Sequence, residues 1–373
     1  MDQAAEQELR RSLGRFLDRH APIDGARRVA EGERFDRPTW RRLCEDLGVL
    51  GMLVPEEAGG QGAGPEMLGV CAEELGRVLY SGPWLASGVL AAGALAALAS
   101  DEVRDAHLPG LLSGEVVGTL AIHDNDSSGD LDWDGEGERV SARPDGDAHV
   151  LDGVKCLVPD LAVADIVLVA ARVQPAGDTG LLLVRTDQVG VTCGEHQTTD
   201  HAHIFGRLEL DNARGVMVAH GSHVVPQLRR LLDVAGLMVA AESVGAAEAV
   251  LRMGVEYAKV RQQFDRPIGG FQAVKHKFAD MHRDIESARY AVRAALTAAE
   301  DADADLRMAA SVAKARAGDA FVGAARENIH LHGGIGYTWE HDAHLYYRRA
   351  LLNRAWLGHP SRHRERIAGL LGL

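Results

Sequence analysis

Two long helical patterns joined by a short corner constrain the fold more than any other feature of the chain. The first pattern, Leu231 to Val260, is apolar almost all round and predicts a helix buried in a bundle. The second, Ala273 to Glu300, has charges on one face and Ala, Val, Phe and Met on the other. The run Arg-Pro-Ile-Gly-Gly at 266–270 ends one helix and starts the next, because proline removes a donor and glycine permits the turn.

The polar residues of this corner form a candidate binding site. We expect Arg261 and Gln263 on the last turn of the first helix and Gln272 on the first turn of the second. A guanidinium group with two amides suits a diphosphate and a heterocycle, because the planar guanidinium can bind phosphate oxygens in pairs. An ordinary polar surface loop is the alternative that the chemistry leaves open.

Size and charge limit the function classes. The 373 residues suffice for two or three domains or one large one, and the formal net charge of −14 argues against non-specific nucleic-acid binding. The four cysteines are scattered without metal-ligand spacing, which predicts free thiols in a reducing, cytoplasmic compartment. The chain opens on a charged helix, and the uncharged stretch from Val78 to Ser100 contains Gly82-Pro83 and much Ala, Gly and Ser. We therefore expect a buried helix from about Trp84, and no membrane span.

Composition predicts three domains in the order helical, β, helical. Their expected limits are 1–116, 117–218 and 219–373. The middle domain contains short β-rich runs separated by Gly, Asp and Pro, a spacing that favours an antiparallel sheet. The expected strands are Val116 to Ile122, Ala148 to Leu151, Ile166 to Val173, Gly180 to Arg185 and Gly206 to Leu210. The acidic run from Asp124 to Glu138 predicts a solvated loop.

Three sequence blocks resemble the acyl-CoA dehydrogenase family. The first is Tyr-Ala-x-x-Arg-x-Gln-Phe-x-x-Pro-Ile-Gly-x-Phe-Gln-Ala-Val-x-His-x-x-Ala-Asp-Met at 257–281, and the second is His-Gly-Gly-Ile-Gly-Tyr-Thr-Trp-Glu-His-Asp at 332–342. The third is Val-Pro-Glu-x-x-Gly-Gly at 54–60, before a helix that ends in Glu-Glu-Leu-Gly-Arg at 73–77. The similarity covers nearly the whole chain and includes actinobacterial members that act on bulky, steroid-type acyl groups.

The resemblance implies a fold and an activity. The fold is an amino-terminal helical domain, a middle β-barrel-like domain and a carboxy-terminal four-helix bundle. The implied reaction is FAD-dependent α,β-dehydrogenation of an acyl-CoA thioester: a carboxylate removes the α-proton, the β-hydride passes to flavin N5, and an electron-transfer flavoprotein or similar acceptor reoxidises the flavin. The implied assembly is a homo- or hetero-oligomer, a dimer or a tetramer.

The family's FAD-binding residues map onto the two carboxy-terminal blocks. By resemblance, Arg261, Gln263, Phe264 and Gln272 contact the diphosphate–adenosine part of an FAD that a neighbouring subunit holds. Gly333, Gly334 and Gly336 let backbone approach that FAD, since no Cβ intervenes. His330 stands where the family usually has Gln, and it can still form one hydrogen bond.

The middle domain departs from the family at its flavin loops. Residues 121–130 replace the family's Thr-Glu-Pro-x-x-Gly-Ser-Asp, and Leu157-Val158-Pro159 replaces its Trp-Ile-Thr. The backbone of Val158 remains as a donor to the flavin, whereas Pro159 has no N–H. These departures suggest a hetero-oligomer in which each chain supplies part of each site.

The position of the catalytic base also departs from the family's pattern. The usual carboxy-terminal position of the family's Glu holds Leu357, and the alternative position on the preceding long helix holds Ala235. Glu242 remains as the candidate base, because it lies two turns from Ala235 on the same face of an otherwise uncharged helix. The alternative is that Glu242 pairs with an arginine, Arg229 or Arg252, and only stabilises the bundle.

Weaker candidates and other function classes remain open. Asp233 and Glu340 are weaker bases, and Glu340 more plausibly orients its own loop. A histidine group, His196, His201 and His203, has no metal-ligand spacing and favours a polar loop over a metal site. Two rival functions are a non-catalytic partner subunit that completes a neighbour's FAD site, and a non-redox enzyme of secondary metabolism with the same fold.

Overall fold

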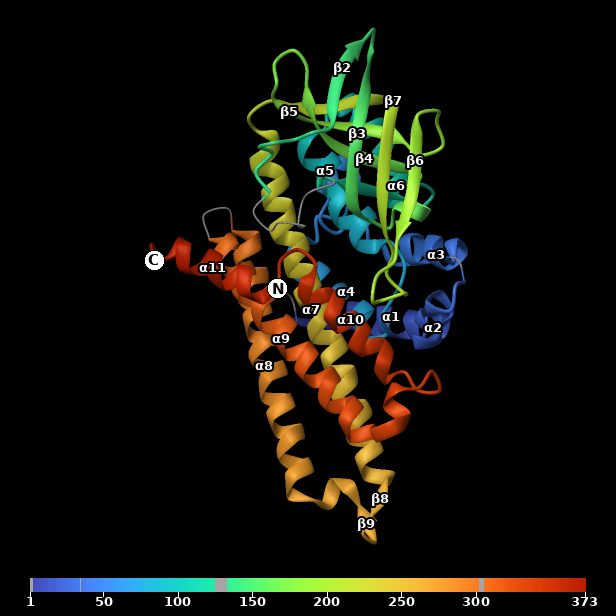
Figure 1. Cartoon of the computed structure of the whole chain (residues 1–373), viewed down its shortest axis with the longest axis vertical. Coiled ribbons are helices and arrows are strands. Elements are labelled where there is room, and N and C mark those ends of the chain that lie inside the picture. The colour runs from blue at the N-terminus through green and yellow to red at the C-terminus, as the bar shows by residue number, and fades with distance from the viewer. Residues whose placement is uncertain (1–2, 34, 125–132, 302–304) are drawn as a thin grey trace. The chain divides into compact units, whose positions relative to one another are not determined.

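Along the chain, helices precede and follow a β-rich middle in the computed structural model, which describes residues 3–33, 35–124, 133–301 and 305–373 (Figure 1). Two compact units account for the contacts. The helical unit comprises Met1–Glu33, Pro65–Ser81 and Gly236–Leu373, and the sheet unit comprises Arg34–Gly64 and Gly82–Ala235. The first 116 residues thus divide between the two units, and the predicted three-domain limits stay a prediction.

The sheet unit contains a closed ring of strands. The strand order is β1-β4-β2-β3-β7-β5, and a further pairing of β4 with β5 closes a ring of β4, β2, β3, β7 and β5. Outside this ring, β1 pairs with β4 and β6 pairs with β7. This confirms the β-barrel-like middle. Most pairings are antiparallel as predicted, but β4 runs parallel to β1 and to β2. The strands are β1 (Gly118–Ala121), β2 (Ser141–Asp145), β3 (Ala148–Pro159), β4 (Ile166–Val173), β5 (Thr179–Arg185), β6 (Val191–His196) and β7 (Phe205–His220).

Two strands of this sheet have weak sequence signals. β2 reads Ser-Ala-Arg-Pro-Asp and β6 reads Val-Thr-Cys-Gly-Glu-His, and neither alternates apolar with polar residues. The central residues of β6 are exposed, and the strand pairs only with β7. An edge strand such as β6 is specified by its neighbour's hydrogen bonds and not by its own propensity.

Short helices complete the sheet unit. They are α3 (Arg37–Leu47), η1 (Glu56–Ala58), the π-helical η2 (Leu85–Ala91), α5 (Ala92–Leu98), α6 (Asp101–Leu112) and η3 (Leu161–Val163). The predicted buried helix after Trp84 is η2 with α5, and every residue of η2 is buried. Ser87 of η2 accepts a hydrogen bond from the amide of Gly118 at 3.2 Å, which ties this helix to β1.

A buried ion cluster corrects the predicted solvated acidic run. The ammonium group of Lys155 is fully buried and lies 2.8 Å from Asp124 Oδ1 and 2.7 Å from Glu138 Oε2. Burial outweighs the attraction of Lys155 and raises the pKa of Glu138 to about 7. Both ends of the acidic run are therefore structural, while residues 125–132 between them lie outside the described part of the chain.

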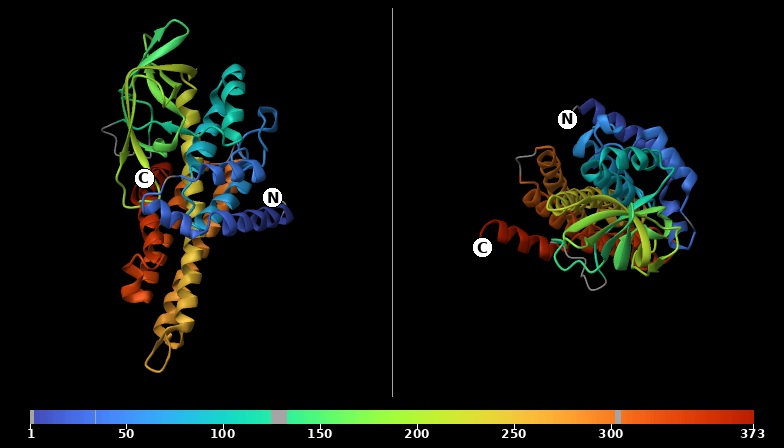
Figure 2. Two further views of the ribbon diagram at one scale, coloured as in Figure 1. Left: turned by 90° about the vertical axis from the view of Figure 1, so that its right-hand side faces the viewer. Right: turned by 90° about the horizontal axis from the view of Figure 1, so that it is seen from above.

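The helical unit is built on three long helices. α7 (Val224–Val260), which begins in the sheet unit, and α8 (Gln272–Glu300) confirm the two predicted helices, and α8 runs back alongside α7 (Figure 2). α9 (Leu306–His332) packs against α8, α10 and α11. The remaining elements are α1 (Gln3–His20), α2 (Ile23–Ala30), α4 (Gly64–Arg77), the short strands β8 (Gln262–Gln263) and β9 (Arg266–Pro267), η4 (Ile268–Gly270), η5 (Gly333–Tyr337), α10 (Ala343–Ala355) and α11 (Pro360–Leu370).

Glycines allow α4 and α7 to cross at backbone contact. A Cβ at Gly245 of α7 would collide with the carbonyl oxygen of Glu73, and one at Gly76 of α4 would collide with that of Glu242. Only glycine permits so close an approach of two helices. The crossing fixes the position of the α7 segment that carries Glu242.

Among the described helices, only α7 is long and apolar enough to cross a membrane by length and composition. Its most apolar window is 89% buried inside the protein. A core helix of the predicted bundle accounts for this burial.

Candidate functional site

The corner after α7 is a β-hairpin and not a direct helix-to-helix turn. α7 ends at Val260, so Arg261 and Gln263 lie beyond the helix and not on its last turn as predicted. Phe264 and Asp265 have φ values of 53° and 62°, and Gln263 pairs with Arg266. Two consecutive residues with positive φ define a type I′ hairpin turn, in which aspartate is better tolerated than most residues.

The predicted ligand-binding side chains at this corner are exposed and have no bonding partner within the described part of the chain. Arg261, Gln263 and Gln272 make no side-chain hydrogen bond or ion pair within the described part of the chain. Phe264 is 86% exposed, and its ring meets that of Phe271 edge-on at 6.1 Å. A guanidinium group, two amides and an aromatic face are therefore available to a ligand from outside this chain.

The glycine turn that follows α9 has two open positions and one packed position. Gly333 has a φ of +64°, and a Cβ at Gly333 or Gly334 would meet nothing within 4 Å. A Cβ at Gly336 would lie 2.9 Å from the carbonyl oxygen of Ile329, so internal packing already requires this glycine. His330 is exposed, with Nδ1 3.9 Å from Glu327. The open glycines fit a close approach of ligand to backbone.

The structure brings the hairpin and the glycine turn together. The ring of Tyr257, one turn before Arg261, stacks on that of His332 with centroids 4.1 Å apart. His332 directly precedes Gly333. Two motifs about seventy residues apart in sequence therefore meet at the same end of the helical unit.

Val158 lies in the sheet unit, on β3. It pairs with Gly206 of β7, and its side chain is buried in the apolar core of the sheet. The preceding residue, Leu157, has a φ of 52° at an irregularity in the strand register. Of the first predicted flavin loop, residues 121–124 are described and 125–130 lie outside the described residues.

The candidate base Glu242 is bound inside the helical bundle. Glu242 is 5% exposed, and its Oε1 accepts hydrogen bonds from Arg349 Nη1 at 2.8 Å and from Asn353 Nδ2 at 3.2 Å. Arg349 is itself 1% exposed. An ionised pair buried in this way is stabilised by its own geometry and is costly to separate.

The arginine partner of Glu242 differs from both predicted ones. The Nε of Arg229 donates to the carbonyl oxygen of Trp133 at 2.8 Å, and Arg252 pairs with Glu248 at 3.3 Å. The true partner, Arg349, comes from α10, 107 residues further along the chain. A pairing this distant leaves no local pattern, and α10 contains three arginines, so its sequence does not single out Arg349.

A buried lysine extends this network. Lys314 of α9 donates to the carbonyl oxygens of Asn353 at 2.7 Å and Gly358 at 3.3 Å. Burial lowers its pKa to about 7. Leu357, at the family's usual base position, is buried and has a φ of 53°. The lysine thus anchors the turn that carries Leu357, a role that sequence reasoning missed.

The remaining candidates lie elsewhere. Glu340 is exposed beside η5, and Asp233 lies in α7, in the sheet unit. The ring of His203 packs on that of Phe205 at 5.4 Å. Within the described residues, no group of three His, Cys, Asp or Glu side chains is placed to hold a metal ion.

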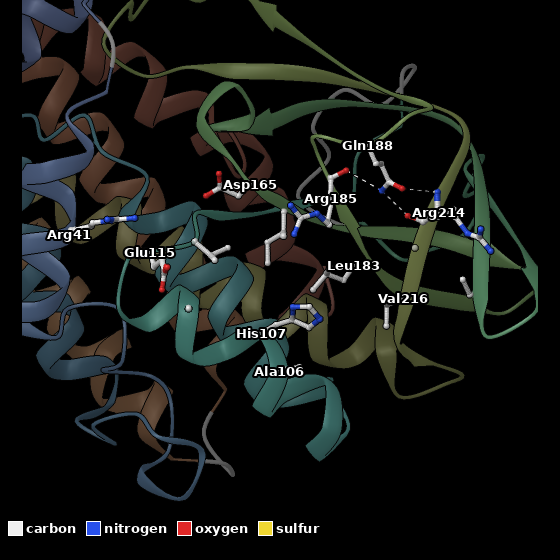
Figure 3. A pocket seen from close by; sticks show the side chains of 15 residues that line it. Arg41, Ala106, His107, Glu115, Asp165, Leu183, Arg185, Gln188, Arg214 and Val216 are labelled. Atoms are coloured by element: carbon white, nitrogen blue, oxygen red, sulfur yellow. Dashed lines mark hydrogen bonds between the residues drawn. The ribbon is translucent and has the colours of Figure 1, made fainter.

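A groove of about 580 Å³ in the sheet unit contains none of the predicted site residues (Figure 3). Its walls include His107 of α6, Leu183 and Arg185 of β5, and Arg214 of β7. Arg185 pairs with Asp187 at 2.9 Å and Arg214 with Asp145 at 3.1 Å. These two cations are therefore already paired, whereas Arg41, which also lines the groove, is exposed.

Comparison with known proteins identifies the family. Residues 3–115 match the acyl-CoA dehydrogenase N-terminal domain, and residues 225–371 match the acyl-CoA dehydrogenase C-terminal domain. The chain is 32% identical over 345 residues to acyl-CoA dehydrogenase IpdE2 of Mycobacterium tuberculosis, covering 92% of this chain and 90% of that protein.

Solved structures agree with this match. The ChsE4-ChsE5 complex from Mycobacterium tuberculosis is similar with a TM-score of 0.87 and 31% identity, covering 100% of this chain and 98% of that one. A variant of the Tcur3481-Tcur3483 steroid ACAD is similar with a TM-score of 0.85 and 34% identity, covering 99% and 98%. The chain therefore belongs to the acyl-CoA dehydrogenase family of oxidoreductases.

Proposed function

We propose that the chain is one subunit of an oligomeric, FAD-dependent acyl-CoA dehydrogenase, and that its hairpin and glycine turn complete the FAD site of a neighbouring subunit. The observation that carries the proposal is the set of unpartnered, exposed side chains of Arg261, Gln263 and Gln272 beside two open glycines. Polar groups held at a rigid hairpin with no partner of their own suit a ligand brought by another chain.

Each residue has a distinct part in this proposal. Arg261 presents a planar guanidinium to the diphosphate, and Gln263 and Gln272 bind polar edges with their amides. Phe264 supplies an apolar face, while Gly333 and Gly334 admit the cofactor to the backbone. When bound, FAD supplies the acceptor for the hydride that leaves the acyl group.

The source of the base separates two versions of this function. In the first, Glu242 removes the α-proton in this chain. In the second, the chain is a partner subunit and another chain supplies the base. The buried contacts of Glu242 with Arg349 and Asn353 favour the second version, because a carboxylate held by two donors in a bundle already has a structural task. Leu357 at the usual base position supports the same version.

The relatives support a bulky substrate and a hetero-oligomer. One similar structure is a steroid ACAD, and another is a complex of two different chains, ChsE4 and ChsE5. We accordingly propose a steroid-type acyl-CoA substrate and a second chain of the same family as partner. An electron-transfer flavoprotein or similar acceptor completes the proposed reaction.

Arg261→Ala tests the FAD assignment. We expect FAD retention to weaken by about 1.5–3 kcal/mol, the range for a hydrogen bond to a charged group. Lys at position 261 should rescue only partly, since it lacks the planar fork. The matched control is Arg283→Ala, an exposed arginine on α8 of the same unit. Equal flavin occupancy in wild type and Arg261→Ala, alone and co-expressed with the partner chain, would refute the assignment.

Glu242→Gln then decides between the two versions. The substitution keeps the shape of the side chain and removes its negative charge. If Glu242 is the base, folding survives and single-turnover flavin reduction falls by about 10²–10⁴-fold. If it is a bundle ion pair, the variant loses stability while each folded molecule keeps near-normal activity. Thermal melts and flavin reduction on the same sample separate the outcomes.

A further inference from the structure

An uninterrupted set of aromatic contacts joins the hairpin to the glycine turn. Tyr257 stacks on His332 at an interplanar angle of 25°, and His332 lies against His341 with ring centroids 4.3 Å apart. Tyr257 belongs to α7, His332 ends α9, and His341 lies just before α10. The three rings therefore link the carboxy-terminal part of α7, the end of α9 and the segment just before α10.

The far end of the turn is anchored separately. Arg27 of α2 pairs with Asp342 at 2.5 Å and also donates to the carbonyl oxygen of Trp339. The ring of Trp339 meets that of His344 edge-on at 4.5 Å, and Arg348 lies over it. The turn from Gly333 to Asp342 is thus held at one end by stacked rings and at the other by an ion pair.

We propose that Tyr257, His332 and His341 are positioning residues that hold the glycine turn next to the Arg261 hairpin, and that the two segments separate when the two histidines become charged. The inference rests on the proposed function, since the relative position of the two segments matters only if both bind one ligand. It goes beyond that function by assigning the coupling to residues that do not themselves face the ligand.

The geometry explains why the rings must be neutral. His332 is buried, and its Nδ1 lies 2.8 Å from the carbonyl oxygen of Asn328. Two imidazolium rings with centroids 4.3 Å apart, tilted by 46°, would place like charges in contact. Desolvation lowers the pKa of both histidines and outweighs the causes that raise it, which are the hydrogen bond to the Asn328 carbonyl oxygen at His332 and the charge of Asp342 at His341.

The charged neighbours of the pair lie beside His341. Asp342 raises the pKa of His341 and Arg27 from α2 lowers it, while burial and Arg348 of α10 lower that of the adjacent His344. Tyr257 from α7 adds an aromatic face to His332. Because Asp342 is already paired with Arg27, protonation of both rings adds repulsion between them and favours their separation.

Tyr257→Leu tests the positioning role. The variant keeps an apolar side chain and loses the ring. We expect faster amide hydrogen exchange in residues 333–341 and in the hairpin, measured on the oligomer well below its melting temperature. FAD dissociation should accelerate by about three- to tenfold, the range for loss of one aromatic pair. Tyr257→Phe keeps the ring and loses only a 3.4 Å hydrogen bond to the His332 carbonyl oxygen, so it should behave as wild type.

His341→Phe tests the pH response with no change in ring stacking. In wild type, FAD dissociation and exchange in residues 333–341 should both accelerate as pH falls below neutrality. In the Phe variant, this acceleration should be largely lost, because only one titrating ring remains in the stack.

The outcomes separate this inference from the proposed function. Unchanged exchange in residues 333–341 of Tyr257→Leu would overturn the positioning role, as would a pH response in His341→Phe equal to that of wild type. If Tyr257→Leu fails to fold, His341→Phe still decides the question, because it keeps all three rings and removes one titrating group. Failure of the proposed function shows instead as unaltered FAD retention in Arg261→Ala.

Discussion

Replacement of Lys314 by Met should remove a distinct pH dependence from the unfolding free energy. Lys314 is 1% exposed, and its pKa falls from the ordinary 10.5 to about 7 because the folded protein excludes water from the ammonium group. The difference of about 3.5 pKa units corresponds to roughly 5 kcal/mol between the two protonation states. This lysine therefore costs the folded state most when it is charged.

The sign follows from proton counts. Between pH 7 and 10.5 the unfolded chain holds the Lys314 proton and the folded chain has released it, so the unfolding free energy rises with pH. Integration of the two titration curves gives a gain of about 1.5 kcal/mol from pH 7 to 8.5. Below pH 6 both states are protonated and the contribution becomes flat.

Urea denaturation of wild type and Lys314→Met at pH 6, 7, 8 and 8.5 measures this gain. The difference between the two proteins should change by about 1.5 kcal/mol above pH 7 and little below it. Other titrating groups cancel in the difference, including Cys44 and Cys71, whose pKa values burial raises to about 12. Lys275→Met, an exposed lysine on α8, is the matched control. A difference that stays constant from pH 7 to 8.5 would refute the reasoning, whatever its absolute size.

Three further predictions follow from the packing and charges. Gly245→Ala should destabilise the helical unit by about 1–3 kcal/mol, because its Cβ meets a backbone carbonyl of α4, while Gly236→Ala on the same helix meets nothing within 4 Å and should be neutral or stabilising in chemical denaturation. In wild type, the raised pKa of Glu138 should make the unfolding free energy fall as pH rises from 4.5 to 7, because the folded state holds this proton more tightly than the unfolded state. Glu138→Gln should flatten this decline, and thermal melts at pH 5 and 7 check it. Phe264→Ser should leave the melting temperature unchanged and weaken FAD retention, and a fall in melting temperature without loss of FAD would contradict its assignment.

The parts of the fold that the sequence predicted are those with local patterns. α7 and α8 follow from apolar periodicity over many turns, and β4 follows from a continuous run of β-branched and apolar residues. The hairpin at Arg261 was expected as a helix-to-helix turn, because Pro267 and the glycines signal a turn but do not specify its type. The two positive φ values at Phe264 and Asp265 define a type I′ turn, and the identities of these two residues do not predict it.

The contacts that the sequence could not predict are long-range pairings of charges. Lys155 pairs with Glu138, the last residue of the run predicted to be solvated, and Arg349 pairs with Glu242 across 107 residues. An arginine one or two turns away is always a plausible partner by spacing, and the choice among arginines depends on how the helices cross. Here the glycine crossing of α4 and α7 and the packing of α10 make that choice.

Two arginines of the helical unit differ in what they bind. Arg349 is enclosed in the bundle and is paired with Glu242, so both charges serve the chain's own stability. Arg261 lies on an exposed hairpin and has no partner in the described chain, so its guanidinium group contributes nothing to the fold. A chain that encloses its candidate base and presents its ligand-binding groups outward is suited to completing a site in another subunit. Flavin reduction by Glu242→Gln, measured with and without the partner chain, tests this contrast. Only the second version predicts that the reduction depends on a carboxylate of the partner chain and not on Glu242.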